Sequence, residues 1–155
     1  MKKILAVAFL FFISLGINAQ ELKWHTDVSE AAKLSLEQKK PMLMFFTGSD
    51  WCGWCIRLQK EVLKTDDFAK WADKNVILVE LDYPRRTPQD QAVREQNQNM
   101  QRMFNVSGYP TVWFVNPEQK EGKKVNLDAL GSTGYVKGGP DAWLAVANQI
   151  LTNKK

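Results

Sequence analysis

Metal ligands are scarce in this sequence, which has one histidine, His25, and two cysteines, Cys52 and Cys55, among 155 residues. A structural zinc site takes four protein ligands and a catalytic zinc site takes three. The three residues would complete such a site only with carboxylates or a second chain. The sequence therefore disfavours a metal centre, and two cysteines are too few for a small fold held together by many disulfides.

Long apolar runs are also missing. The run Ile4–Ile17 has 14 residues, whereas a helix that spans a bilayer needs about 20. It follows Lys2 and Lys3 and precedes Ala19, an arrangement typical of a secretory signal peptide. We expect residues 1–19 to be removed, leaving a mature domain over residues 20–155 without a membrane span. The protein would then work in a bacterial periplasm or be secreted; an uncleaved anchor is the alternative.

Strong charge is absent. The formal net charge is +4, and Lys2 and Lys3 account for two of these charges. We find no basic stripe with interleaved aromatic residues, so nucleic acid is not expected as a partner. The glycines near residues 131–139 lack the lysine and the spacing of a phosphate-binding loop, and no cofactor is expected. Arg85 and Arg86 are expected to lie in an exposed charged loop, with the steering of an acidic partner as the alternative.

The hydrophobic pattern of the mature chain alternates between strand and helix and predicts a single α/β domain. A helix opened by Thr87 and Pro88 should turn Met103, among other apolar residues, toward the core. A polar turn over residues 116–123 should join the last two strands as a hairpin. The expected strands are 22–25, 42–46, 76–81, 111–115 and 125–130, and the other expected helices are 29–39, 52–63, a short one after Thr65, and 141–151.

Both cysteines fall in the stretch GSDWCGWC, between a buried strand and a helix. A thiolate at a helix N-terminus is stabilised by free N–H groups and the helix dipole. Cys52 would then be the attacking thiol, and Cys55, one turn deeper, the resolving thiol. Gly53 would permit the tight helix start, and Trp51 and Trp54 would either offer apolar surface to a substrate or pack the loop. A metal-ligand pair and a structural disulfide remain alternatives, although closing a two-residue loop removes little chain entropy.

The sequence D-W-C-G-W-C after a buried strand and G-Y-P-T before a later one resemble the thioredoxin superfamily. The chain is most similar to its secreted members, and to the soluble thioredoxin-like domains of transmembrane thiol:disulfide interchange proteins. The resemblance implies a thioredoxin fold, with a central mixed β-sheet flanked by helices. It also implies a cis peptide bond before Pro110, so that the backbone of Tyr109 faces a substrate strand.

This sequence departs from the family pattern at one position that carries chemistry. Many thioredoxins have a buried aspartate in the strand before the active site, but residues 42–46 contain no acid. Glu80, a single acid in the apolar run 76–81, is a candidate replacement as a proton relay for Cys55. The alternative is that Glu80 points outward at a strand end.

These features together predict an extracytoplasmic thiol:disulfide oxidoreductase that reduces protein disulfides rather than forming them. Its partners would be protein thiols and disulfides and a membrane electron donor or acceptor. The alternative is a non-catalytic binding module, such as a metal or cofactor-protein chaperone that uses the two cysteines as ligands.

Overall fold

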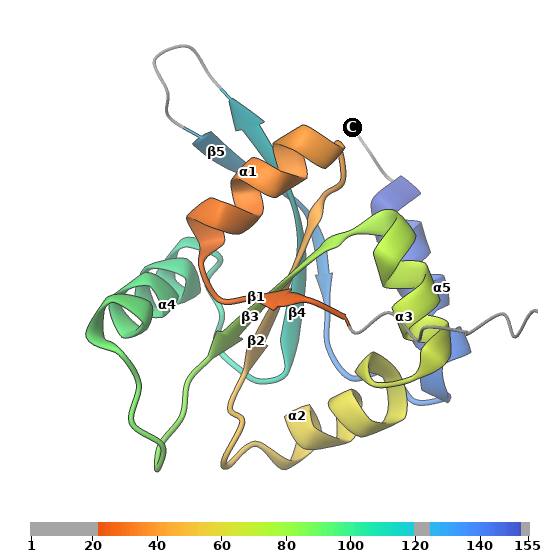
Figure 1. The fold of residues 1–155 in the computed structure, drawn as a ribbon. Coiled ribbons are helices and arrows are strands. Elements are labelled where there is room, and N and C mark those ends of the chain that lie inside the picture. The colour runs from red at the N-terminus through yellow and green to blue at the C-terminus, as the bar shows by residue number, and fades with distance from the viewer. Residues whose placement is uncertain (1–21, 120–124, 153–155) are drawn as a thin grey trace, which may run out of the picture.

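In the computed structural model, which describes residues 22–119 and 125–152, five strands form one mixed sheet at the centre of the molecule (Figure 1). Across the sheet the order is β1-β3-β2-β4-β5. The first three are parallel to one another, and β4 and β5 run antiparallel to their neighbours. The strands are β1 (Trp24–His25), β2 (Met42–Thr47), β3 (Ile77–Asp82), β4 (Thr111–Gln119) and β5 (Val125–Thr133). The predicted signal peptide, residues 1–19, lies outside the described residues.

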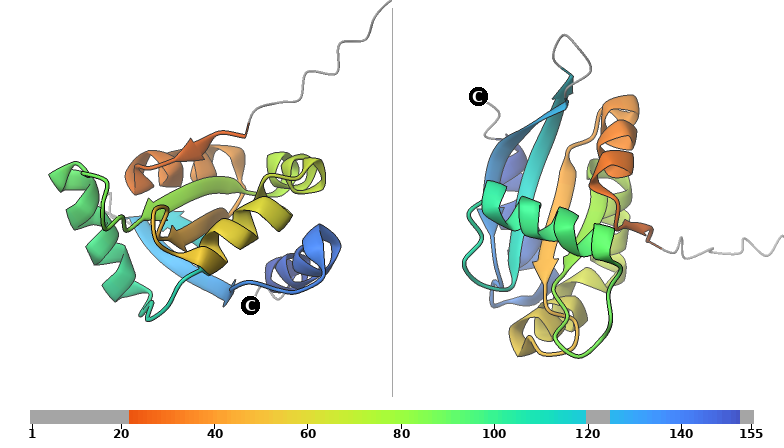
Figure 2. Two further views of the ribbon diagram at one scale, coloured as in Figure 1. Left: turned by 90° about the horizontal axis from the view of Figure 1, so that it is seen from below. Right: turned by 90° about the vertical axis from the view of Figure 1, so that its left-hand side faces the viewer.

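Helices cover both faces of this sheet (Figure 2). One face carries α1 (Val28–Gln38) and α4 (Gln91–Met103). The other carries α2 (Gly53–Leu58), its π-helical continuation η1 (Gln59–Leu63), α3 (Asp66–Asn75) and α5 (Gly139–Thr152). The prediction of an α/β domain with a mixed sheet between helices is confirmed. None of the helices in these two ranges is long and apolar enough to cross a membrane.

The central strand β2 explains why the sheet is covered on both sides. All six of its residues, MLMFFT, are buried. Side chains alternate between the faces of a strand, so Met44 and Phe46 pack with α1 and α4, whereas Leu43 and Phe45 pack with α2, α3 and α5. The unbroken apolar run is what a strand between two helical layers requires.

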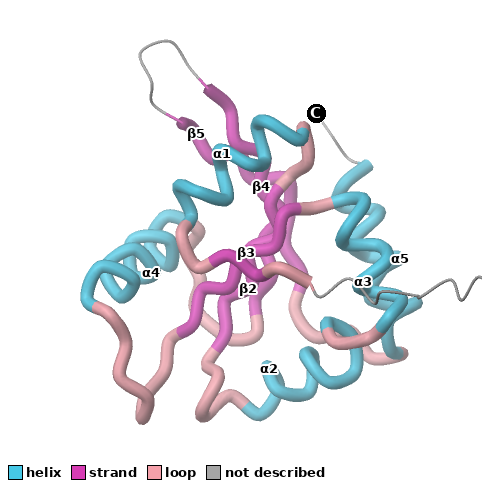
Figure 3. The backbone as a smooth tube through the Cα atoms, in the orientation of Figure 1, coloured by secondary structure: helices cyan, strands magenta, loops and turns pink. Residues whose placement is uncertain are grey.

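Three loops meet at one end of the sheet (Figure 3). Thr47 at the end of β2 lies beside Asp82 at the end of β3, because these two strands are parallel. The start of β4 reaches the same edge, since Phe46 pairs with Thr111 in the antiparallel direction. The loops after β2, after β3 and before β4 are therefore neighbours, although they are far apart in the sequence.

The predicted start of α4 is wrong. The helix begins at Gln91, and the side chain of Asp90 caps it by accepting the N–H groups of Ala92 and Val93. Thr87 is not free to act as the cap, because its N–H and hydroxyl groups both donate to Asp50 in the loop after β2. A hydrogen bond to a residue 37 positions away therefore prevents Thr87 from capping the helix, although the local sequence favours that role.

Two further expectations also differ from the structure. Met103 does not face the core but is 60% exposed, and the buried residue of α4 is Asn97, which donates to the carbonyl of Asp82. β4 does not stop at Val115 but continues to Gln119, and it includes Pro117. The pairing with β2 ends at Val115, so the proline, which lacks an N–H group, lies where β4 has only β5 as a neighbour.

Candidate active site

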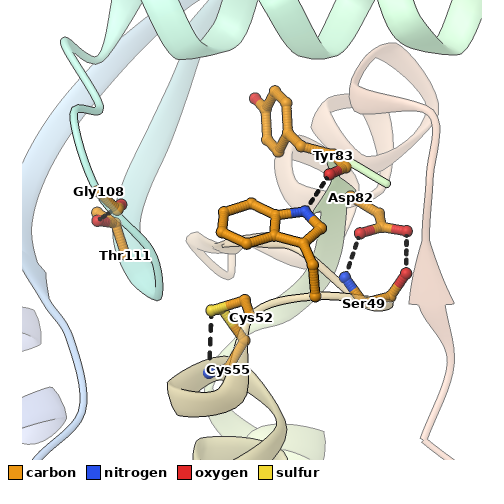
Figure 4. The surroundings of a disulfide bond; sticks show 8 residues. Ser49, Cys52, Cys55, Asp82, Tyr83, Gly108 and Thr111 are labelled. Atoms are coloured by element: carbon orange, nitrogen blue, oxygen red, sulfur yellow. Dashed lines mark hydrogen bonds between the residues drawn. A yellow bond between two sulfur atoms is a disulfide. The ribbon is translucent and has the colours of Figure 1, made fainter. Parts of the chain in front are cut away.

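Cys52 and Cys55 form a disulfide at the beginning of α2, with 2.02 Å between the sulfur atoms and 5.2 Å between the Cα atoms. Cys52 is the N-cap residue of the helix, and its sulfur accepts the N–H of Cys55 at 3.2 Å (Figure 4). The first sulfur therefore lies where the helix presents its free N–H groups and the positive end of its dipole.

The two cysteines differ in exposure. Cys52 is 5% exposed and Cys55 is fully buried, and both belong to the core cluster under α2, α3 and α5. Because Cys52 keeps some exposed surface and Cys55 keeps none, an incoming disulfide would meet Cys52 first. The buried Cys55 is placed one helical turn further in, three residues along the chain.

Two carboxylates hold the loop before the cysteines against the loop after β3. Asp82 accepts the N–H of Ser49 at 2.8 Å and its hydroxyl at 2.6 Å (Figure 4). Asp50 accepts the backbone N–H groups of residues 85, 86 and 87 at 2.8–3.0 Å. The N–H of Arg85 contributes most to holding the pKa of Asp50 down at about 2. The carboxylate therefore stays ionised, and the loop stays joined, through the physiological pH range.

Trp51 packs this loop rather than lying free on the surface. Its indole N–H donates to the carbonyl of Tyr83 at 2.8 Å. The indole lies so close over Gly48 that an added Cβ there would be 2.4 Å from the ring. The Cζ of Arg85 is 3.7 Å from the ring centroid and covers one face of the indole.

The peptide bond between Tyr109 and Pro110 is cis, directly before β4. The ring of Tyr109 meets Trp51 edge-to-face, with centroids 5.6 Å apart, and lies 5.2 Å from the ring of Tyr83. Partial burial raises the pKa of Tyr109, while the charge of Arg85 acts in the opposite direction. The segment before β4 is thus joined to the loop before Cys52 through aromatic contacts.

Trp54, between the cysteines, is 55% exposed. Its ring lies 5.2 Å from that of Tyr135, and the guanidinium of Arg57 lies over both rings. Arg57 in turn pairs with Glu61 at 2.8 Å, and the hydroxyl of Tyr135 also donates to Glu61. These contacts hold one edge of Trp54 while leaving apolar surface beside the disulfide.

The sequence-based reason for Gly53 is wrong. Its φ angle is not in the left-handed region, which holds only Gly131, Gly138 and Gly139 among the glycines in the described part of the chain. A Cβ at Gly53 would meet nothing within 4 Å. The backbone therefore does not require glycine at the start of α2, and Gly53 contributes open space beside Cys52 instead.

Glu80 does not point into open solvent from a strand end. It lies in β3, two residues from Leu78, on the same face of the sheet as the cysteines. It lines a pocket of about 200 Å³ together with Phe45, Gln59 and Lys64. Burial, with a smaller contribution from Asp82, raises its pKa. Gln59, which also lines this pocket, lies one helical turn after Cys55, and its N–H donates to the carbonyl of Cys55.

Several residues of the site were missed from the sequence. Gly48, Asp50, Asp82 and Tyr135 were not singled out, although each makes a contact that positions the cysteines or Trp54. Gly48 and Asp50 directly precede the cysteines, and glycine and aspartate are typical of a tight turn before a helix, so a local signal existed. Asp82 and Tyr135 carry no such signal, because their partners lie 33 and 74 positions away.

Histidine takes no part in this site. His25 is buried at the end of β1, with its Nδ1 3.5 Å from the carboxylate of Glu30. Among residues 22–119 and 125–152, no three histidine, cysteine or acidic side chains are grouped so that they could hold a metal ion.

Comparison with known proteins agrees with this arrangement. The thioredoxin-like family model matches residues 23–117. The chain is 34% identical over 120 residues to disulfide bond reductase DsbH of Chlamydia pneumoniae, covering 77% of this chain and 72% of that protein. It is 33% identical over 121 residues to the thioredoxin-related protein DsbJ of the same organism, covering 78% of this chain but 33% of DsbJ.

Solved structures show the same fold. The structure of DsbH oxidoreductase superposes with a TM-score of 0.76 at 28% identity, covering 99% of this chain and 96% of that one. A thioredoxin from Thermus thermophilus superposes with a TM-score of 0.61 at 18% identity, over 84% of this chain and 87% of that one. At that identity the second match shows the fold alone.

Proposed function

The chain belongs to the thioredoxin-like family and is a thiol:disulfide oxidoreductase, and from this premise we propose that it reduces protein disulfides outside the cytoplasm. The observation that carries the proposal is the Cys52–Cys55 disulfide at the start of α2, with the sulfur of Cys52 on the helix N-terminus. The relative DsbH, named a disulfide bond reductase, supports the reducing direction. The signal-like residues 1–19 support the location.

The two cysteines take different roles in this reaction. The Cys52 thiolate attacks one sulfur of a substrate disulfide, forms a mixed disulfide and releases the first substrate thiolate. The Cys55 thiolate then attacks the sulfur of Cys52, releases the second substrate thiolate and forms the Cys52–Cys55 disulfide. Two electrons pass from this protein to the substrate. An external donor must restore them, and we infer a membrane electron donor.

Glu80 serves the second step as a proton relay. Cys55 is fully buried and must lose its proton before it can attack. Glu80 lies on the same face of the sheet, in a pocket that reaches Gln59, one turn after Cys55. A raised pKa makes the carboxylate a better proton acceptor, which suits a group that takes a proton from Cys55 and later returns it. Water in the pocket would carry the proton between Cys55 and Glu80.

The substrate segment lies across the loop before β4 and the exposed face of α2. The backbone of Tyr109, next to Pro110, pairs with the extended substrate chain. The exposed ring of Trp54 and the open space at Gly53 receive side chains next to the substrate disulfide. Trp51 contributes indirectly, because its hydrogen bond to the carbonyl of Tyr83 holds the loop that carries Cys52.

The test is an insulin-reduction assay with dithiothreitol as the electron source. Cys52→Ser should abolish turnover. Reduced Cys55→Ser, mixed with insulin after dithiothreitol has been removed, should accumulate a mixed disulfide that can be isolated on a non-reducing gel. Retention of activity by Cys52→Ser would contradict the assignment of the nucleophile. Tight Cu(I) binding by a wild-type protein that reduces nothing would favour the binding-module alternative.

The direction of electron flow needs a separate measurement, the equilibrium of the two cysteines in a series of glutathione ratios. A reduction potential below about −220 mV fits a reductase. A value near −150 mV or above would instead identify a donor of disulfides.

A further inference from the structure

We propose that Arg85 determines substrate specificity by binding a carboxylate of an aspartate or glutamate that flanks the substrate cysteine. The proposal rests on the proposed function, because it concerns the same surface beside Cys52. Arg85 and Arg86 are both exposed, as expected from the sequence, and the proposal develops the alternative stated there, that this loop steers an acidic partner.

The position of Arg85 is set by its backbone. Asp50, two residues before Cys52, accepts the N–H of Arg85 at 3.0 Å and those of the next two residues at 2.8 and 2.9 Å. These bonds join the loop after β3 to the loop that carries the nucleophile. Arg85 therefore keeps its place relative to Cys52 although it is exposed to solvent.

The side chain of Arg85 is oriented as well. Its guanidinium stacks on the indole of Trp51, the residue directly before Cys52, at 3.7 Å from the ring centroid. Stacking on one face leaves the N–H groups at the edge of the planar group, the geometry that binds a carboxylate through two hydrogen bonds. The same indole meets Tyr109, whose pKa responds to the charge of Arg85. The cation therefore lies on the indole that directly precedes Cys52 in the chain and that also contacts Tyr109, the residue beside which the substrate is expected to lie.

The charge of Arg85 is available to a partner. Within residues 22–119 and 125–152, the ion pairs involve Lys23, His25 and Arg57, and none involves Arg85. The carboxylate of Asp50 is occupied by backbone N–H groups and the hydroxyl of Thr87. Arg57, which also lies over an active-site tryptophan, is a useful contrast, because Glu61 already neutralises it.

The test compares two disulfide-linked peptides that differ only in carrying glutamate or glutamine beside the reactive cysteine. The wild-type protein should show a kcat/KM for the glutamate peptide about three- to fivefold higher than for the glutamine peptide at low salt, the size of an exposed ion pair. The ratio should approach one in 0.5 M salt, because exposed charges are screened.

The variants Arg85→Gln and Arg86→Gln then form a matched pair. The first should lower the ratio to about one, whereas the second, which removes an equal charge from the next residue, should keep it. Arg85→Glu should reverse the preference toward a lysine-bearing peptide. A ratio of one in the wild type, or a ratio that survives in Arg85→Gln, would overturn the proposal. If Arg85→Gln lowered kcat/KM equally for both peptides, the proposal would also be overturned, because Arg85 would then act through Cys52 and not through the acidic residue.

A binding measurement separates this proposal from the proposed function. Peptides with serine in place of cysteine cannot react, and their dissociation constants from the oxidised protein can be read by tryptophan fluorescence. If no peptide is turned over, the proposed function fails. The dissociation constants of the glutamate and glutamine peptides still decide whether Arg85 binds the acidic residue. Equal constants would reject the proposal.

Discussion

Gly48 offers the sharpest test of how the active-site loop is built. The replacement Gly48→Ala would place a Cβ 2.4 Å from Cε2 and 2.5 Å from Nε1 of Trp51, distances that real contacts do not reach. The indole must therefore move, and three contacts change with it. These are the hydrogen bond to the carbonyl of Tyr83, the edge-to-face contact with Tyr109 and the stacking with Arg85.

The magnitude follows from these contacts. A hydrogen bond contributes about 0.5–1.5 kcal/mol to stability, an aromatic pair about 0.5–1.5 kcal/mol and an exposed cation–π contact about 0.5–1 kcal/mol. Alanine also restricts the unfolded chain, which offsets about 0.4–1 kcal/mol. We therefore expect Gly48→Ala to lower the free energy of unfolding by about 1–3 kcal/mol. It should also slow insulin reduction, because the loop carries Cys52.

The assay is urea denaturation of the oxidised protein, followed by circular dichroism and by tryptophan fluorescence. Gly53→Ala is the matched control, since a Cβ at that residue meets nothing within 4 Å. Alanine favours a helix over glycine by up to about 1 kcal/mol, so this variant should be as stable as the wild type or more so. If Gly48→Ala unfolds at the wild-type urea concentration, the packing of Trp51 over Gly48 does not hold the loop.

Three further predictions concern the charged and exposed groups of the site. Glu80 has a raised pKa because its ionised form is disfavoured in the folded protein. Glu80→Gln should therefore be more thermally stable than the wild type as pH rises above the usual value of 4.5, and equally stable below it. The variant should also prolong the lifetime of the mixed disulfide, and an unchanged lifetime would remove Glu80 from the mechanism. Asp50 has a lowered pKa, so its contribution is fully present above pH 3.8 and is lost as pH falls through about 2. The difference in acid unfolding between wild type and Asp50→Asn should therefore shrink below pH 3.8 and vanish below about pH 2, and a difference that persists there must have another source. Trp54→Ala should raise KM for peptide disulfides severalfold with little change in melting temperature, since the ring is 55% exposed; a large loss of stability would instead identify Trp54 as a packing residue.

Local patterns predicted the strands and the position of the two cysteines at the start of a helix. The apolar run at residues 42–46 identified a strand covered on both faces, and all of β2 is buried. The short helix expected after Thr65 is α3, and the hydroxyl of Thr65 caps it by accepting the N–H of Phe68. Such signals can be read from the sequence because each depends on residues within one turn or one strand.

The same local reasoning failed where a distant residue competes for a group. Thr87 has the character of a helix cap, but its donors are taken by Asp50 and the helix starts four residues later, at Gln91. Met103 fits a helical apolar pattern but is exposed. Asn97, a polar residue, is the buried residue of α4, and its side chain donates to the carbonyl of Asp82. In both cases the partner comes from another element of the fold.

The sequence by itself determined the chemistry of this protein: two cysteines at the start of a helix, a proline before a strand, and an apolar chain that must fold into covered layers. Only the tertiary structure decided that Glu80 faces the same side of the sheet as the cysteines and that Arg85 lies on Trp51. The orientation of a strand residue depends on register, and a shift of one position would turn Glu80 to the opposite face. The contact between Arg85 and Trp51 depends on the parallel pairing of β2 and β3, which brings together loops more than 30 residues apart.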